Sequence, residues 1–243
     1  MLIINADDYG FNERCTDRIL DCYLNGRITS TSAMVFMRDS IRAAETARMH
    51  GLHVGLHLNF TNALENTAGY PDLSSHQNRI IDFFAKNRFT RMLYNPAIKK
   101  SLSYSFKSQY DEFLNRYLKP PTHIDGHHHI HLCTNMLIDP LYPNGIKLRP
   151  SLHCEEGRLT IFKNLYRTLI DRVIRNRYKS VESLFKLDLH SIDALLPDIV
   201  DSSMSSDIEL MTHPGIRKEY EYLKSDRYEG MISQGRLGSY ASL

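Results

Sequence analysis

The stretch LIINADDYG (residues 2–10) runs an apolar segment suited to a buried strand straight into two adjacent carboxylates and a glycine. Asp and Gly are typical of tight turns, so Asp7, Asp8 and Gly10 indicate first of all that the strand ends there. Adjacent residues on a straight strand face opposite sides of the sheet. Both carboxylates can therefore serve one site only where the strand has ended and the chain is turning.

Strand-like and helix-like segments alternate along the rest of the chain. We expect strands, some with their exits, in segments 2–6, 28–36, 53–60, 122–132, 146–150 and 207–215, with a helix and a short final strand in 231–240. We expect helices in segments 12–26, 39–51, 78–87, 96–118 and 159–178, and a long polar loop over 59–80. Strand and helix in turn predict right-handed βαβ units, a parallel sheet and an α/β fold. No internal repeat or composition change marks a boundary, so we expect one domain over residues 1–243.

The composition excludes several classes of partner. The net charge of +2 is too small to indicate nucleic acid or a membrane surface as a partner. No apolar run approaches the roughly 18–20 residues that a membrane span needs, and we expect no signal peptide. The four cysteines lack C-x-x-C spacing, which favours reduced thiols and a cytoplasmic protein. The unusual feature is 12 histidines, four of them within five positions.

Polar side chains follow the expected strands where each one ends. They are Asp7, Asp8, His57, Asp125, the histidines of 127–131, Arg149 and His213. The carboxyl ends of parallel strands lie on one rim, where ligands bind. We therefore expect residues spread over 200 positions of sequence to meet at one site.

The segment HIDGHHHIH favours a metal site. If it is extended, then Asp125, His127, His129 and His131 share one face and His128 lies on the other. Neutral imidazole is the commonest metal ligand, and a neighbouring carboxylate can orient it. One histidine on a strand is more often structural, but four on one short segment favour a metal.

His57 and His213 have competing interpretations. His53 and His57 share a face of their strand, and His57 is the better ligand candidate because it lies at the exit. One Asp and two His form a facial triad with open positions, which suits a catalytic divalent ion. His213 precedes Pro214, so a turn residue and a general acid near the metal are equally good interpretations.

At this point six motifs, in this order, resemble the YdjC-like carbohydrate deacetylases, including the chitooligosaccharide deacetylases. The motifs are NADDYG (5–10), ITSTSAMV (28–35), VGLHL (54–58), THIDGHHHIHL (122–132), ELMTHPG (209–215) and GRLGSY (235–240). Together they span nearly the whole chain. The resemblance implies a distorted (β/α) barrel with mostly parallel strands, a hydrolase activity and a role in carbohydrate metabolism.

The same resemblance implies the site. It places one divalent metal ion on Asp8, His57 and His127, makes Asp7 the general base and makes His213 the general acid. The reaction implied is removal of the acetyl group from an N-acetylated amino sugar or chitooligosaccharide, with release of acetate. It also makes a homodimer reasonable.

Other residues have supporting roles. Asp125, His129 and Arg149 are expected to bind substrate or to support the ligands, and Arg149 is a candidate for stabilising the oxyanion. Two imidazoles and a carboxylate suit zinc, manganese, cobalt or iron, while the resemblance also allows magnesium.

Two alternatives stay open. A metal-dependent phosphoesterase on a related barrel would hold two or three metals, for which His129 and His131 leave room. A non-catalytic metal- or sugar-binding protein is disfavoured by Asp7, because a binding site has no use for a second carboxylate beside the ligand.

Overall fold

The computed structural model describes residues 1–87, 89–139, 141–152 and 161–243. In the first quarter of the chain strands and helices alternate as expected. The elements are β1 (Leu2–Tyr9), α1 (Glu13–Leu24), β2 (Ser30–Ala33), α2 (Ser40–Met49) and β3 (Val54–Leu58). Helix α1 begins where the Asn12 side chain accepts a hydrogen bond from the Cys15 N–H, and it buries Cys15, Ile19 and Cys22 at helical spacing.

Longer helices separate the later strands. The elements are α3 (Leu73–Ala85), η1 (Thr90–Met92), η2 (Pro96–Ile98), α4 (Lys99–Tyr117), β4 (Ile124–Gly126), η3 (His127–Leu132), α5 (Thr134–Ile138), α6 (Ile161–Arg177), β5 (Ser183–Lys186), α7 (Ile192–Ser202), β6 (Ile208–Thr212), α8 (Arg217–Leu223), α9 (Asp226–Ile232) and β7 (Leu237–Gly238). Among the helices of these described stretches, none is long and apolar enough to cross a membrane.

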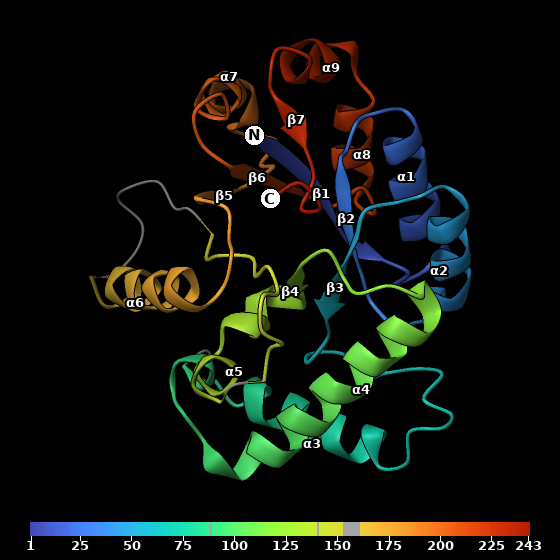
Figure 1. Ribbon diagram of the computed structural model, residues 1–243, viewed down its shortest axis with the longest axis vertical. Helices are drawn as coiled ribbons and strands as arrows, with labels where there is room; N and C mark the ends of the chain where they lie inside the picture. The colour runs from blue at the N-terminus through green and yellow to red at the C-terminus, as the bar shows by residue number, and fades with distance from the viewer. Residues whose placement is uncertain (88, 140, 153–160) are drawn as a thin grey trace.

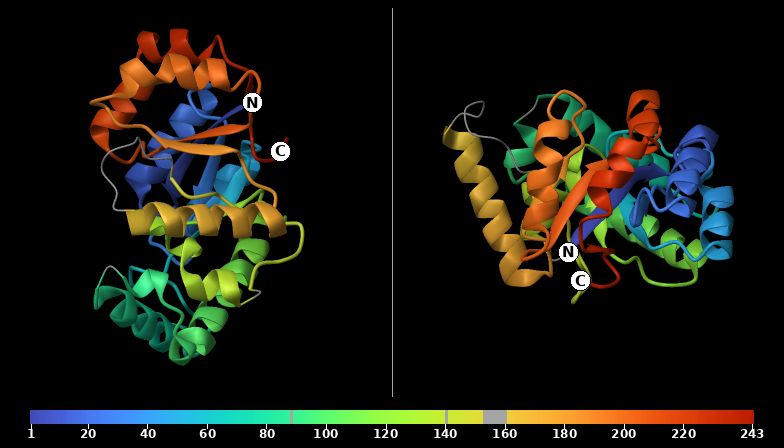
Figure 2. Two further views of the ribbon diagram at one scale, coloured as in Figure 1. Left: turned by 90° about the vertical axis from the view of Figure 1, so that its left-hand side faces the viewer. Right: turned by 90° about the horizontal axis from the view of Figure 1, so that it is seen from above.

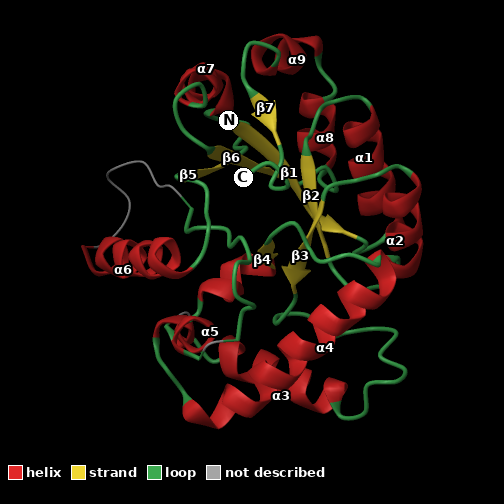
Figure 3. Ribbon diagram, in the orientation of Figure 1, coloured by secondary structure: helices red, strands yellow, loops and turns green. Residues whose placement is uncertain are grey.

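The strands form one parallel sheet in the order β4-β3-β2-β1-β6-β5, with β7 on β1. The sheet curls into a half-barrel at the centre of the molecule, with the helices outside it (Figure 3). Helices α1, α2 and α8 lie along one flank, while α3 and α4 pack together at the far end (Figure 1). Helix α6 lies at the outer edge of the molecule, as the turned views show (Figure 2). The expected α/β fold and distorted barrel are confirmed.

The segment expected as a strand over 146–150 joins the two edge strands. Leu148 of this segment forms a parallel bridge to Ile124 of β4, and Leu152, two residues after the segment, forms one to Leu184 of β5. The bridges are isolated, so this segment is not a continuous strand. It nevertheless carries Arg149 into the space between β4 and β5, where the Arg149 N–H donates to the Ile124 carbonyl at 3.1 Å.

Helix α3 begins earlier than its sequence indicated. The polar stretch expected to be loop up to residue 80 is helical from Leu73. Its buried positions are Leu73, Gln77 and Ile80, and the glutamine in the middle hides the helical period. Gln77 is buried because its side-chain amide donates to the Asn59 carbonyl at 3.0 Å.

The sequence indicated that β1 ends before the two carboxylates. In the structure the strand continues past them to Tyr9. Ala6 pairs with Thr31 of β2, and the next pair is Tyr9 with Ala33. Over this interval β1 therefore has one residue more than β2. Asp8 has a φ of 71° and Gly10 a φ of 85°. A β-bulge of this kind re-aims side chains, which lets adjacent residues serve one site.

We expect Gly10→Ala to destabilise the fold more than Gly26→Ala. Both glycines have positive φ, which costs an alanine roughly 1–2 kcal/mol. Only at Gly10 would the new methyl group also crowd Met34, Ser40 and Ala43, at 3.1–3.3 Å, which adds about 1–3 kcal/mol of overpacking. Urea unfolding of both variants measures the difference. Equal losses would show that the packing around Gly10 relaxes freely.

Candidate metal-dependent active site

The structure brings the predicted rim residues together. Asp7 and Asp8 lie near the end of β1, His57 is the penultimate residue of β3, His127 directly follows β4, and His213 directly follows β6. These are the carboxyl ends of neighbouring parallel strands, which is where α/β sheets place ligand sites. Because the strands are parallel, residues that are far apart in the sequence become neighbours at this edge of the sheet.

Asp8, His57 and His127 form a group whose donor atoms all lie within 4.8 Å of one another. Asp8 Oδ1 is 3.0 Å from His127 Nδ1 and 3.4 Å from His57 Nε2. Two imidazole nitrogens and one carboxylate oxygen are the donor set of open, catalytic divalent-metal sites. The residues present fit the metal that the resemblance implies.

His57 is held in the orientation that a metal ligand needs. Its Nδ1 lies 2.8 Å from Oδ1 of the fully buried Asp125, which leaves Nε2 directed toward Asp8. A carboxylate behind a histidine fixes the tautomer and ring orientation in metal sites. Burial lowers the pKa of His57, but Asp125 and Asp7 outweigh burial and raise that pKa well above its usual value. The prediction that Asp125 supports the site thus has a geometric basis.

Arg149 occupies a different place from the oxyanion contact considered from the sequence. Its side chain is completely buried and holds Asp7 through two hydrogen bonds, of 2.7 and 2.6 Å. The same guanidinium lies 2.8 Å from Asp125 Oδ2 and 2.6 Å from Glu209 Oε1. Its positive charge is thus shared by three carboxylates of the protein, those of Asp7, Asp125 and Glu209.

This ion cluster sets the charge of its members. Burial raises the pKa of Asp7, but Arg149 and His57 outweigh burial, so the pKa lies well below its usual value. The same balance lowers the pKa of Asp125 to about 2. At Glu209 burial prevails over Arg149 and raises the pKa to about 7. Asp7 and Asp125 are therefore ionised at neutral pH, whereas Glu209 titrates there.

His213 faces Asp7 across the site. Its Nε2 lies 4.0 Å from Asp7 Oδ2, and its Nδ1 lies 3.6 Å from Glu219 Oε2. Glu219 also accepts the His213 backbone N–H at 2.7 Å, which fixes both groups. Burial lowers the pKa of His213, but Glu219 and then Asp7 raise it above its usual value. Of the two interpretations of His213, this arrangement favours the acid.

The histidine run does not continue as an extended segment, so the predicted alternation of faces is wrong. Strand β4 ends at Gly126, and η3 has left-handed backbone at His128 (φ 53°) and His129 (φ 56°). His131 is buried with its Nε2 3.2 Å from the Arg149 carbonyl, away from the Asp8 group. Within the described residues, only His127 of this run joins a candidate metal group.

Sequence reasoning missed four residues around the site. Glu209 and Glu219 hold Arg149 and His213, and Tyr240 donates a hydrogen bond to Glu209. The His123 ring stacks on Tyr240 with centroids 3.8 Å apart. The sequence could have indicated a buried role for Glu209, because this residue is the one charged residue in the apolar run of β6. Nothing local identifies the others.

Comparison with known proteins identifies the family of this chain. The family model described as YdjC-like protein matches residues 1–235. A carbohydrate deacetylase of Clostridium beijerinckii is 27% identical over 220 residues, covering 88% of this chain and 81% of that protein. Chitooligosaccharide deacetylases of Serratia marcescens and Yersinia pestis are 30% and 32% identical over 133 residues, covering 54% of this chain and 51% of each relative.

A solved structure shares the fold over almost the whole chain. It is an Enterococcus faecalis protein named for cellobiose-phosphate cleavage, with a TM-score of 0.68 and 20% identity. The match covers 99% of this chain and 97% of that one. With the six motifs in order and a family match over residues 1–235, the chain belongs to the YdjC-like protein family.

Proposed function

We propose that this protein is a metal-dependent hydrolase that removes the acetyl group from an N-acetylated amino sugar or chitooligosaccharide and releases acetate. One observation carries the proposal. The Asp8, His57 and His127 group lies beside Asp7 and His213, which face each other at 4.0 Å. The names of the relatives, carbohydrate deacetylase and chitooligosaccharide deacetylase, support this substrate class.

Asp8, His57 and His127 would hold one divalent ion. When bound, such an ion supplies a Lewis acid for the amide carbonyl and lowers the pKa of bound water from 15.7 toward ~7 for zinc. The two imidazoles favour zinc, manganese or cobalt over magnesium. The surrounding carboxylates Asp7 and Asp125 add negative charge, which favours a cation at this point.

Asp7 and His213 divide the proton transfers. Asp7 accepts the proton of the attacking water, and Arg149 keeps it ionised and fixed in place. His213, held as imidazolium by Glu219 and Asp7, donates a proton to the departing sugar amine. An ionised Asp7 and a protonated His213 are the charge states that the base and the acid of amide hydrolysis need.

The test of function is acetate release together with a metal count. We expect protein loaded with zinc, manganese or cobalt to release acetate from N,N′-diacetylchitobiose, with one metal bound per chain. Two or three metals and hydrolysis of phosphoesters without acetate release would favour the phosphoesterase. Metal and sugar binding without any turnover would favour the binding protein.

We expect Asp7→Asn and Asp8→Asn to fail in different ways. The Asp7 variant should keep its metal and lose about 10²–10⁴-fold in kcat, because it lacks the base. The Asp8 variant should lose the metal, because a carboxylate ligand is replaced by a neutral amide. Metal content by atomic absorption and acetate release separate the two. A fully active Asp7→Asn enzyme would contradict the role assigned to Asp7.

We expect Glu219→Gln to move the alkaline limb of the kcat/KM profile to lower pH. The carboxylate raises the pKa of His213, so its removal lets the imidazolium lose its proton at lower pH. Asp7 and Asp8 also raise this pKa and stay in place in the variant. Glu219→Asp is the matched control and should keep most of the wild-type profile. An unmoved limb in Glu219→Gln would contradict the coupling.

A further inference from the structure

Glu209 of β6 is a completely buried carboxylate for which the reaction steps above have no use. In the sheet it pairs with Ile3 of β1 on one side and with Leu184 of β5 on the other, so its strand neighbours are apolar. A buried carboxylate needs compensation. Arg149, at 2.6 Å from Glu209 Oε1, and the hydroxyl of Tyr240, which donates to Glu209 Oε2, supply it.

The two terminal nitrogens of Arg149 each lie between Asp7 and one further carboxylate. Nη1 lies 2.7 Å from Asp7 Oδ2 and 2.8 Å from Asp125 Oδ2. Nη2 lies 2.6 Å from Asp7 Oδ1 and 2.6 Å from Glu209 Oε1. Asp125 and Glu209 therefore attract opposite corners of one planar group, and Asp7 occupies the fork between these corners. Without one of the two corner contacts the guanidinium would tilt, and the Asp7 carboxylate would tilt with it.

Residues 236–243, which we call the β7 segment, bring Tyr240 to Glu209. Strand β7 of this segment pairs with β1. The Lys147 ammonium donates to the Tyr240 carbonyl, and Lys147 lies two residues before Arg149. The β7 segment thus contacts both the carboxylate that orients the guanidinium and the stretch of chain that carries it.

The ring of Tyr240 is fixed by His123, so that its hydroxyl reaches Glu209. The two rings stack with centroids 3.8 Å apart and planes 14° from parallel. Gly55 of β3 leaves room for His123, since a Cβ at this glycine would lie 2.3 Å from the imidazole. Burial lowers the pKa of His123 to about 3, so this ring is neutral and adds no charge beside Glu209. Burial raises the pKa of Tyr240 well above its usual value, so its hydroxyl stays a donor.

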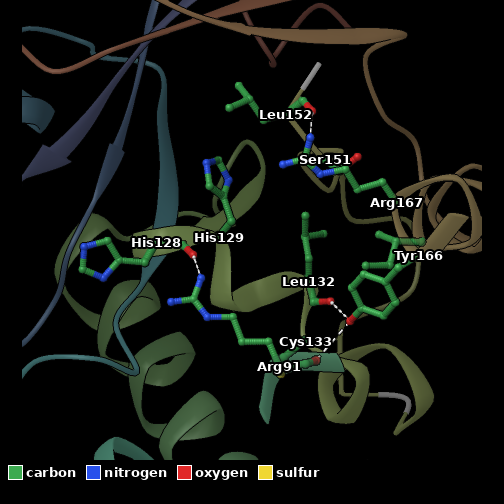
Figure 4. Close-up of a pocket in the computed structure, with 10 residues that line it drawn as sticks. Arg91, His128, His129, Leu132, Cys133, Ser151, Leu152, Tyr166 and Arg167 are labelled. Carbon is green, nitrogen blue, oxygen red and sulfur yellow. Dashed lines mark hydrogen bonds between the residues drawn. The ribbon is translucent and has the colours of Figure 1, made fainter. Parts of the chain in front are cut away.

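The arginine beside the histidine run takes no part in this arrangement. Figure 4 shows the guanidinium of Arg91 donating to the His128 carbonyl, at 2.8 Å. Among the residues that the structure describes, Arg149 is the one arginine that pairs with Asp7. The orientation of Arg149 therefore decides where the Asp7 carboxylate lies.

We propose that Tyr240 and Glu209 are positioning residues for the base, which together hold the Arg149 guanidinium in the orientation that presents Asp7 to the attacking water. This inference rests on the proposed function. Both residues are completely buried and reach Asp7 through Arg149, so they act on the base without touching substrate. A displacement of about 1 Å near a reacting group can cost roughly 100-fold in rate, so a smaller tilt is expected to cost severalfold.

The corner contact depends on the ionised form of Glu209. Burial raises the pKa of Glu209 to about 7, against the opposing effects of Arg149 and the Tyr240 hydroxyl. Asp7 of β1 also faces Glu209 and raises this pKa further, whereas Leu184 of the adjacent β5 carries no charge. The hydroxyl bonds to the ionised carboxylate, so its removal raises the pKa of Glu209. The orienting charge is then lost at a higher pH than in wild type.

The test is the pH profile of kcat for acetate release from N,N′-diacetylchitobiose by metal-loaded Tyr240→Phe protein. This change keeps the ring on His123 and removes one O–H group. We expect kcat to fall severalfold with KM unchanged, and the acid limb of the profile to move to higher pH. Tyr228→Phe is the matched control, because Tyr228 is also completely buried and donates to the Arg27 carbonyl at 3.1 Å. Its profile should be that of wild type.

Glu209→Gln is the second variant, because an amide of the same shape keeps an acceptor for Tyr240 and never ionises. We expect it to have a lowered kcat at every pH. Metal content and urea unfolding identify folded protein before each assay. The same kcat and acid limb in wild type, Tyr240→Phe and Glu209→Gln would overturn the positioning role and leave the deacetylase standing. A loss of kcat in Tyr240→Phe with an unmoved acid limb would also overturn it, since a loosened core has that effect.

Infrared pH titration separates this inference from the proposed function, because it needs no substrate. In wild type the C=O band of a protonated carboxyl should grow as the pH falls through the Glu209 pKa of about 7. The band should be missing in Glu209→Gln and should appear at higher pH in Tyr240→Phe. These spectra without acetate release by wild type would overturn the deacetylase and keep the coupling of Tyr240 to Glu209. Identical titrations of wild type and Tyr240→Phe would overturn the coupling, whether or not acetate is released.

Discussion

The burial of one guanidinium among three carboxylates is the constraint on which the site depends. An isolated buried charge is too costly to persist, and removing one member of a buried ion cluster is strongly destabilising. Arg149 meets this constraint by binding Asp7 of β1, Asp125 of β4 and Glu209 of β6, all with less than 5% of the residue exposed. The bridging segment between β4 and β5 thus supplies the charge that ties three strands together. Two of these carboxylates also contact histidines of the site, since Asp7 faces His213 and Asp125 orients His57.

The charge balance of the rim explains why a divalent cation fits there. Asp7, Asp8 and Asp125 all have a lowered pKa, so they carry three negative charges at neutral pH. Arg149 and the His213 imidazolium each supply one positive charge, and the raised pKa of His57 places a proton on that ring as well. Glu209, whose pKa is raised to about 7, can take up a proton and relieve its own repulsion with Asp7. A divalent ion at the Asp8, His57 and His127 group would take the place of the proton on His57 and keep these carboxylates compensated.

The sequence was sufficient for the parallel topology and for the arrival of Asp7, Asp8, His57, His127 and His213 at the rim, because both follow from local patterns. Apolar runs predict strands, and the residues that follow them lie at the carboxyl ends. The sequence was insufficient wherever the role of a residue depends on a partner far away in the chain. The contact between Arg149 and Asp7 joins positions 142 residues apart, and the Arg91 guanidinium donates to the carbonyl of His128, 37 residues after it. Period-2 alternation failed over the histidine run because that rule holds only inside a strand, and β4 ends at Gly126.

The bulge in β1 resolves the puzzle of two adjacent carboxylates at one site. On a regular strand Asp7 and Asp8 would point to opposite faces, and one of them would leave the rim. The extra residue and the left-handed Asp8 let Asp7 turn inward to the buried Arg149 while Asp8, with 21% of its side chain exposed, faces His57 and His127. Burial thereby separates two chemically identical groups, one enclosed with an arginine and one at the open edge beside two imidazoles. The ligand and the base that we propose can be neighbours in sequence because the backbone gives two identical side chains different surroundings.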